Sequence, residues 1–263
     1  MIGIFDSGVG GLTVAREIIK KLPNNKIIYF GDTARYPYGT KSPSLITKYS
    51  IQNTKFLLSK GAKIIVVACN SASAVASEKL KKYFPKTPIF EVISPAVAKA
   101  IKTTKNNKIG IIGTRATIST DIYNKKINKN KNAYKIFNQA CPLFVPLAEE
   151  GWTSTQATQL IAQTYLDPLK KKNIDTLILG CTHYPLLRPL IKKITGAKIR
   201  LVDPAENTAL ELKKYLSKNN NIANKLIKSN KHAFYFSDIS PHLDKLIANW
   251  LGRSIKPKLH IIK

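Results

Sequence analysis

Two of the three cysteines, Cys69 and Cys181, occupy matching places in the sequence. Each follows a short apolar run and precedes a polar residue, Asn70 after the first thiol and Thr182 after the second. The apolar runs predict buried strands, and the polar residues predict helix starts. Amide donors and the dipole at a helix start favour a thiolate over a thiol. A lone buried cysteine is usually a packing residue, but this placement indicates two thiols that take part in chemistry.

Two opposed thiols suit the inversion of a carbon atom that carries a weakly acidic hydrogen. One thiolate removes the proton from one face, and the other thiol returns a proton to the opposite face. Each sulfur then needs a neighbour that sets its protonation state. Asp6 ends the first predicted strand and could serve Cys69, while His183 lies two residues after Cys181 and could serve that thiol. The pattern therefore predicts proton-transfer catalysis by these four residues.

Other uses of the cysteines fit the sequence less well. A zinc site could take Cys69, Cys181 and His183 as ligands, but the paired spacing typical of zinc sites is absent. The odd number of cysteines predicts no disulfide framework. Cys141 has no polar neighbour and is predicted to be structural. The glycines before Thr13 lack the third glycine of a dinucleotide loop, so no nicotinamide cofactor is predicted. Because the spacing typical of zinc ligands is also absent, no metal is predicted.

Short apolar runs alternate with longer amphipathic runs, which is typical of parallel sheets covered by helices on both faces. Strands are predicted at 2–5, 26–30, 63–68, 108–112, 135–137, 175–179, 198–202, 233–237 and 259–262. Helices are predicted at 12–21, 44–60, 73–83, 152–172, 186–194, 205–218 and 241–250, with one more from about 119. The Lys- and Asn-rich stretch after residue 218 predicts a solvated loop or a poorly ordered helix end.

The two halves of the chain repeat the same plan. Residues 2–8 resemble residues 109–115 at a shift of 107 positions. Residues 65–71 resemble residues 177–183 at a shift of 112 positions. The near-equal shifts indicate an internal duplication of one α/β domain.

This duplication predicts two pseudo-symmetric α/β domains with the active site in the cleft between them. The first domain is predicted to span 1–95 and to be completed by 208–263, and the second to span 96–207. Ligands of open α/β sheets bind beyond the carboxyl ends of the strands. If the two domains face each other, each presents one thiol to a shared cleft.

The chain of 263 residues has a net charge of +28, from 43 basic and 15 acidic residues. Of the basic residues, 37 are Lys and 6 are Arg, and the Lys residues are scattered along the whole chain. Arg is the residue that reads bases and phosphates with paired hydrogen bonds. A solvated surface is therefore favoured over a basic nucleic-acid-binding protein, which would gather Lys and Arg on one face. A basic exterior could still draw in an anionic substrate.

The cellular location is predicted from apolar patterning. Apolar residues make up 44% of the chain, enough for a packed core. Apolar stretches such as 64–69 are far too short to cross a bilayer. The N-terminus has no basic segment followed by an apolar one, so no secretory signal is predicted. We expect a cytoplasmic protein.

Five strings of residues, in order, resemble the motifs of the glutamate racemase family. They are GIFDSGVGGLT at 3–13, GDTARYPYG at 31–39, ACNSAS at 68–73, PLFVPLAE at 142–149 and GCTHYPL at 180–186. The resemblance covers nearly the whole chain and implies two flavodoxin-like domains. It implies a cofactor-independent isomerase that interconverts L- and D-glutamate and supplies D-glutamate for peptidoglycan synthesis. Two departures keep a hydroxyl group: Ser71 replaces the usual Thr, and Thr120 replaces a common Ser.

The resemblance also implies a role for each matching residue. Cys69 would remove the α-proton from D-glutamate and Cys181 from L-glutamate, assisted by Asp6 and His183 respectively. The groups that hold the substrate would be Asp6, Ser7, Tyr38, Gly39, Asn70, Ser71, Glu149, Thr182 and His183.

Some positions and partners stay open at this point. Glu150 rivals Glu149 as the acidic residue of the site, and Thr117 could also touch the substrate. The implied partners are the small molecule glutamate and a second copy in a homodimer, with no nucleic acid and no membrane. The alternative within the same superfamily is an aspartate racemase.

Overall fold

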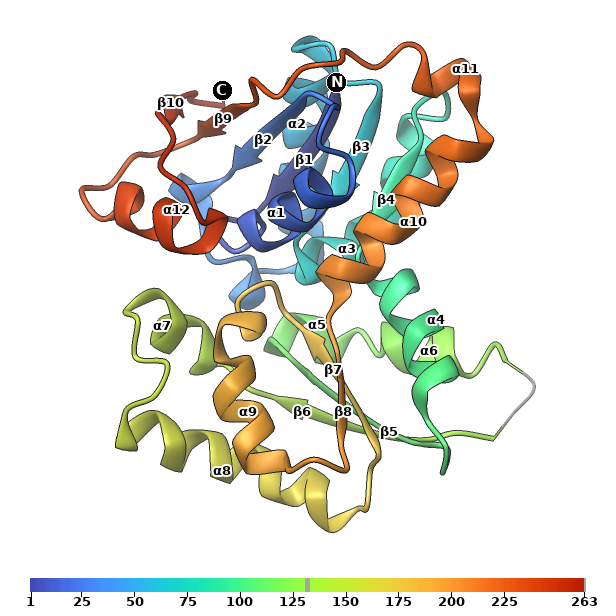
Figure 1. Cartoon of the computed structure of the whole chain (residues 1–263), viewed down its shortest axis with the longest axis vertical. Coiled ribbons are helices and arrows are strands. Elements are labelled where there is room, and N and C mark those ends of the chain that lie inside the picture. Colours follow the sequence, from blue (N-terminus) through green and yellow to red (C-terminus); the bar gives the residue numbers. More distant parts are fainter. Residues whose placement is uncertain (131–132, 263) are drawn as a thin grey trace.

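Two parallel β-sheets form the framework of the computed structural model, which describes residues 1–130 and 133–262. The first sheet has the strand order β10-β9-β2-β1-β3-β4, and the second has the order β6-β5-β7-β8. The strands are β1 (Ile2–Asp6), β2 (Ile27–Gly31), β3 (Ile64–Val67), β4 (Ile89–Glu91), β5 (Lys108–Gly113), β6 (Lys135–Ala140), β7 (Thr176–Gly180), β8 (Arg200–Val202), β9 (Ala233–Phe236) and β10 (Lys258–Leu259). Figure 1 shows the two sheets in separate halves of the molecule, with both chain ends in the half of the first sheet.

Helices connect the strands and cover the sheets. They are α1 (Leu12–Lys21), α2 (Pro43–Ser59), α3 (Asn70–Tyr83), α4 (Ile93–Thr103), α5 (Arg115–Ser119), α6 (Ile122–Ile127), α7 (Phe144–Glu149), α8 (Gln156–Lys171), α9 (Arg188–Thr195), α10 (Pro204–Lys218), α11 (Asn220–Ala223) and α12 (Leu243–Leu251). Three short 3-10 helices complete the set: η1 (Thr33–Arg35), η2 (Tyr38–Thr40) and η3 (Tyr184–Leu187). Within the described residues, no helix combines the length and the apolar character that a membrane crossing requires.

The central strands are buried on both faces because helices pack on each side of the sheets. Every residue of β1, β3 and β7 is buried, whereas the edge strand β6 is partly exposed along its length. Such strands must be apolar in a continuous run, since neither face meets water. The sequence has such continuous apolar runs at these strands. The predicted pair of parallel α/β sheets is confirmed.

The first four strands of each sheet follow the same order. In the first sheet β2 and β3 flank β1, with β4 next to β3, and in the second sheet β6 and β7 flank β5, with β8 next to β7. The strands β3 and β7, which precede the two thiols, therefore occupy equivalent places. Because all strands within a sheet are parallel, their carboxyl ends lie at one edge of that sheet.

The C-terminal segment returns to the first sheet. β9 pairs with β2, and β10 pairs with β9. Figure 1 shows this segment, in red, beside the blue N-terminal strands. Residues of α10 pack in one core with α1, whereas residues of α4 pack in one core with β5 and β7. We propose that the two sheets mark two domains, with divisions near those predicted from the sequence.

Several elements differ from the sequence prediction. β4 and α4 were not predicted, because two prolines and short polar residues break the apolar periodicity of this region. The helix predicted from residue 152 begins at Gln156, where the hydroxyl of Thr155 caps it. The helix predicted at 186–194 is divided into η3 and α9, and the stretch after residue 218 contains the short helix α11.

Replacing Ile111 with Ala tests the contribution of the core that α4 shares with β5 and β7. Ile111 is a fully buried residue of β5, so the variant should lower the free energy of unfolding by about 2–5 kcal/mol. Urea denaturation followed by circular dichroism measures this loss. The matched control is Ile227→Ala, because Ile227 is 49% exposed and should change stability by less than about 0.5 kcal/mol. Equal losses in both variants would contradict the assigned core.

Candidate active site

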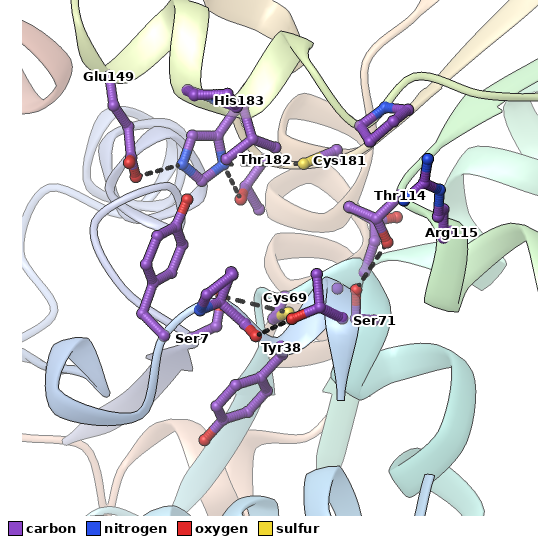
Figure 2. Close-up of a pocket in the computed structure, with 18 residues that line it drawn as sticks. Ser7, Tyr38, Cys69, Ser71, Thr114, Arg115, Glu149, Cys181, Thr182 and His183 are labelled. Carbon is purple, nitrogen blue, oxygen red and sulfur yellow. Dashed lines mark hydrogen bonds and ion pairs between the residues drawn. The ribbon is translucent and has the colours of Figure 1, made fainter. Parts of the chain in front are cut away.

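One cavity of about 290 Å³ contains most of the side chains that the sequence singled out. Its walls include residues that directly follow β1, β3, β5 and β7. The predicted site residues that line it are Ser7, Tyr38, Gly39, Cys69, Asn70, Ser71, Glu149, Cys181, Thr182 and His183. Figure 2 shows the two sulfur atoms on opposite sides of the cavity, Cys69 from the half of the first sheet and Cys181 from the half of the second.

Cys69 caps the N-terminus of α3. Its sulfur accepts a hydrogen bond from the amide of Ala72 at 3.5 Å, and its thiol donates to the hydroxyl of Ser7 at 3.7 Å. Burial raises the pKa of Cys69 to about 12, and the negative charge of Asp6 acts in the same direction. The two hydrogen bonds lower the pKa but do not cancel burial. Cys69 is therefore a neutral thiol at pH 7, ready to give a proton.

Asp6 is fully buried at the end of β1 and lies outside the cavity wall. Its Oδ2 accepts a hydrogen bond from the amide of Gly8 at 3.0 Å, and its Oδ1 has no hydrogen-bond partner among the described residues. Burial raises the pKa of Asp6, while the charge of His183 and nearby amides lower it. Asp6 therefore acts on the site through its charge beside Cys69, rather than from the wall that a ligand would touch.

Cys181, His183 and Glu149 form a chain of polar contacts on the other side of the cavity. Nδ1 of His183 lies 3.7 Å from the sulfur of Cys181, and Nε2 lies 2.9 Å from Oε1 of Glu149. Burial lowers the pKa of His183, but hydrogen bonds to Cys181 and Glu149, with the negative charges of both, raise it to about 10. The imidazole is therefore protonated at pH 7. A protonated imidazole beside a sulfur stabilises a thiolate.

Residues of the opposite half hold His183 in place, although His183 itself follows a strand of the second sheet. A Cβ atom at Gly10 would lie 2.5 Å from Cε1 of His183, so this close approach requires glycine. Trp250 of α12 meets the imidazole edge-on, with ring centroids 5.0 Å apart. Tyr36 stacks on it, with centroids 6.3 Å apart and ring planes 30° from parallel. The acid–base group is thus assembled only when the two halves are packed together.

Asn70 lines the cavity and carries a buried amide donor. Its Oδ1 accepts a hydrogen bond from the hydroxyl of Tyr123 at 2.7 Å, which fixes the orientation of the amide. Its Nδ2 is buried and has no hydrogen-bond partner among the described residues. A buried donor without a partner is unfavourable, so Asn70 holds an unsatisfied amide next to the thiol of Cys69 in the sequence.

Three hydroxyl groups meet at the junction of α3 and α5. Ser71 Oγ lies 3.0 Å from Thr114 Oγ1, and Thr117 Oγ1 lies 3.1 Å from Thr114 and 3.4 Å from Ser71. Ser71 and Thr114 line the cavity, whereas Thr117 is buried behind them. Ser71 belongs to one half and the threonines to the other, so this cluster also links the two halves across the cleft.

The loop around η2 forms another wall, and its anchor lies outside the cavity. The hydroxyl of Tyr38 donates to the buried carboxylate of Asp32 and accepts a hydrogen bond from Asn53 at 3.1 Å. Arg35 pairs with Asp32 at 2.7 Å. The Tyr38 hydroxyl is therefore committed to this network, and Figure 2 shows its ring directed away from the thiols. Tyr38 serves the wall chiefly by fixing the loop that carries Gly39.

Other sequence candidates lie apart from the cavity. Glu150 is exposed, and Glu149 is the acidic residue that lines the wall. Cys141 is fully buried in the core that packs α7, α8 and α9 against β7, and burial raises its pKa. The zinc alternative finds no support within residues 1–130 and 133–262, which contain no cluster of three or more His, Cys, Asp or Glu side chains suited to a metal ion.

Several residues of the cavity wall were not predicted from the sequence, chief among them Tyr36, Thr114 and Arg115. Thr114 follows β5 directly, so its position at the end of a strand could have predicted it as a residue of the cavity wall. Tyr36 lies within a motif that was recognised but without an assigned role. Arg115 gave no signal because it is one of many basic residues in the chain. Trp250 comes from the far C-terminus, and only the packing of α12 brings it to His183.

Comparison with known proteins gives a consistent assignment. The sequence model described as Asp/Glu/Hydantoin racemase matches residues 9–212. A curated glutamate racemase from Geobacter metallireducens is 45% identical over 251 residues, which cover 95% of this chain and 92% of the relative. The crystal structure of glutamate racemase isoform RacE1 from Bacillus anthracis superposes with a TM-score of 0.92 at 38% identity, covering 99% of this chain and 97% of the other. Glutamate racemase from Francisella tularensis in complex with D-glutamate superposes with a TM-score of 0.91 at 37% identity, covering 100% and 97%.

The fold, with two parallel sheets facing one cavity that holds two thiols, is that of an isomerase, an amino-acid racemase. The chain belongs to the aspartate/glutamate racemase family.

Replacing Glu149 with Gln tests the Glu149–His183 contact. The neutral amide removes one of the two groups that raise the pKa of His183, so the imidazolium loses its proton at a lower pH. The basic limb of the kcat/KM profile should therefore move down by about one to two pH units, the equivalent of one charged hydrogen bond. Glu150→Gln is the matched control, because Glu150 is exposed and lies outside the cavity wall. Coincident basic limbs in wild type and Glu149→Gln would refute the assigned role.

Proposed function

We propose that this enzyme interconverts L-glutamate and D-glutamate by proton transfer between two thiols. The observation that carries the proposal is the placement of Cys69 and Cys181 on opposite sides of one cavity. The glutamate racemases among its relatives, including one with bound D-glutamate, support the choice of substrate. The proposal includes a supply of D-glutamate for peptidoglycan, and a cytoplasmic homodimer that uses no cofactor.

In the direction from L-glutamate, Cys181 is the base and Cys69 is the acid. The Cα–H bond breaks as an S–H bond forms on Cys181, and the electron pair stays on the substrate carbon. The S–H bond of Cys69 then breaks as a new Cα–H bond forms on the opposite face, which gives D-glutamate. In the reverse direction, Cys69 takes the proton and Cys181 returns one. No bond other than these two is exchanged, so the two thiols account for the whole reaction.

The charges around the two sulfurs support this division of labour. Cys69 is buried beside the negative charge of Asp6, which favours the thiol. The sulfur of Cys181 lies 3.7 Å from Nδ1 of His183, an imidazole that is protonated at pH 7. The proposed mechanism requires Cys181 as the base and Cys69 as the acid when L-glutamate binds. After one turnover the protonation states are exchanged, and the enzyme is set for D-glutamate.

Polar groups around the thiols suit a substrate with two carboxylates. Asn70 offers a buried amide donor, and Ser7, Ser71 and Thr182 offer hydroxyl groups in the wall. Donors aimed at the carboxylate next to Cα would also stabilise the carbanion, because its negative charge spreads onto that carboxylate. Such electrostatic stabilisation is the largest help an enzyme can give to removal of a weakly acidic proton. Asp6 supports the site from behind the wall, through its effect on Cys69.

Serine variants of the cysteines test the two-thiol mechanism. Cys69→Ser and Cys181→Ser should each lower the rate of racemisation of both enantiomers by about 10²- to 10⁴-fold. A serine hydroxyl is a far weaker acid than a thiol, so it gives up its proton less readily and is rarely deprotonated to act as a base. Circular dichroism should show unchanged folds. Cys141→Ser is the control and should keep its activity, because Cys141 does not line the cavity and its thiol donates to the carbonyl of Gln139 at 3.7 Å. Full activity of either active-site variant would disprove the mechanism.

Racemisation in deuterated water tests the route of the proton, and solvent deuterium should appear at Cα of the product enantiomer. The same assay, run with glutamate and aspartate and followed by chiral analysis, separates a glutamate racemase from an aspartate racemase. Turnover of aspartate alone would favour the alternative substrate.

A further inference from the structure

The cavity is electrostatically uneven from end to end. Figure 2 shows Glu149 at one end, Thr114 and Arg115 at the other, and the two thiols between them. Glu149 is paired with His183 at 2.9 Å, so the opposite charges of these two side chains balance each other at this end. At the opposite end, the hydroxyls of Ser71 and Thr114 lie next to Arg115 in the wall. An anionic group entering the cavity is therefore attracted to the end that holds Arg115.

Arg115 stands apart from the other basic residues of this strongly basic chain. Among the Lys and Arg residues of the described ranges, Arg115 is the one that lines the cavity. Its guanidinium forms no ion pair within the described part of the chain, in contrast to Arg35, which is held by Asp32. The guanidinium presents two parallel N–H donors that match the two oxygens of a carboxylate. Arg115 is an exposed residue of the cavity wall, so a ligand that enters the cavity can reach its guanidinium.

We propose that Arg115 binds the side-chain carboxylate of the substrate and thereby determines specificity for an amino acid with a second carboxylate at the length of glutamate. This inference rests on the proposed function. The α-carbon must lie between the sulfurs, so the side chain of the substrate extends from there toward one end of the cavity. The end with Arg115, Ser71 and Thr114 offers a cation and hydroxyl donors, whereas the other end offers the carboxylate of Glu149. Aspartate is one methylene shorter and would bring its second carboxylate less close to Arg115.

Steady-state kinetics on three variants test the proposal. Arg115→Gln should raise KM for glutamate about threefold to tenfold and leave kcat within about twofold, because Arg115 binds the carboxylate and takes no part in proton transfer. Arg115→Lys keeps the charge and should recover part of the loss. Arg200→Gln is the matched control, because Arg200 is an exposed residue of β8 that does not line the cavity. The preference for glutamate over aspartate in kcat/KM should fall in Arg115→Gln alone.

Ionic strength gives a second readout. The contact of an exposed guanidinium with a carboxylate is screened by salt, so KM of the wild-type enzyme should rise with added salt and approach that of Arg115→Gln. An unchanged KM in Arg115→Gln, or the same change in Arg200→Gln, would overturn the inference. A fall in kcat at constant KM would overturn it as well, since that result assigns Arg115 to the chemical step. A wild-type enzyme that leaves glutamate unchanged would instead refute the proposed function, before any variant is compared.

Discussion

The chain of contacts from Cys181 through His183 to Glu149 is the interaction on which the candidate site depends. A buried imidazole tends to lose its proton, but the contacts with Cys181 at 3.7 Å and Glu149 at 2.9 Å raise the pKa of His183 to about 10. Its position is fixed by Gly10, Tyr36 and Trp250 of the other half. The position of the imidazole beside Cys181 therefore depends on how the two halves of the molecule pack together.

The two thiols occupy equivalent places in the two sheets but have neighbours of opposite charge. Both thiols follow equivalent parallel strands, so the repeated fold alone would give them equal properties. Local neighbours remove this equality: Cys69 is buried beside a carboxylate, and Cys181 lies beside an imidazolium. A proton relay across a substrate needs one acid and one base at a time. Duplication supplies two matched positions, and the neighbouring residues make them different.

Much of the fold could be predicted from the sequence, because buried parallel strands leave a distinctive pattern. Continuous apolar runs such as 64–67 arise only where both faces of a strand are covered. The prediction failed where this signal is weak. β4 has three residues and the following helix α4 contains a proline, so neither shows a clear period. The start of α8 depends on a cap by Thr155, and periodicity does not locate such a cap.

The sequence by itself determined which residues have the chemistry: two thiols after matching strands, a histidine two residues from one of them, and polar residues at strand ends. Tertiary structure alone decided which of these face the cavity. It placed Glu149 rather than Glu150 against His183, buried Asp6 behind the wall and committed the Tyr38 hydroxyl to Asp32. It also brought Trp250 and Arg115 to the site. The physical reason is that contacts between distant segments form only when helices and sheets pack together. The apolar pattern of a segment shows which of its faces is buried, but it does not identify the distant residue that this face will contact.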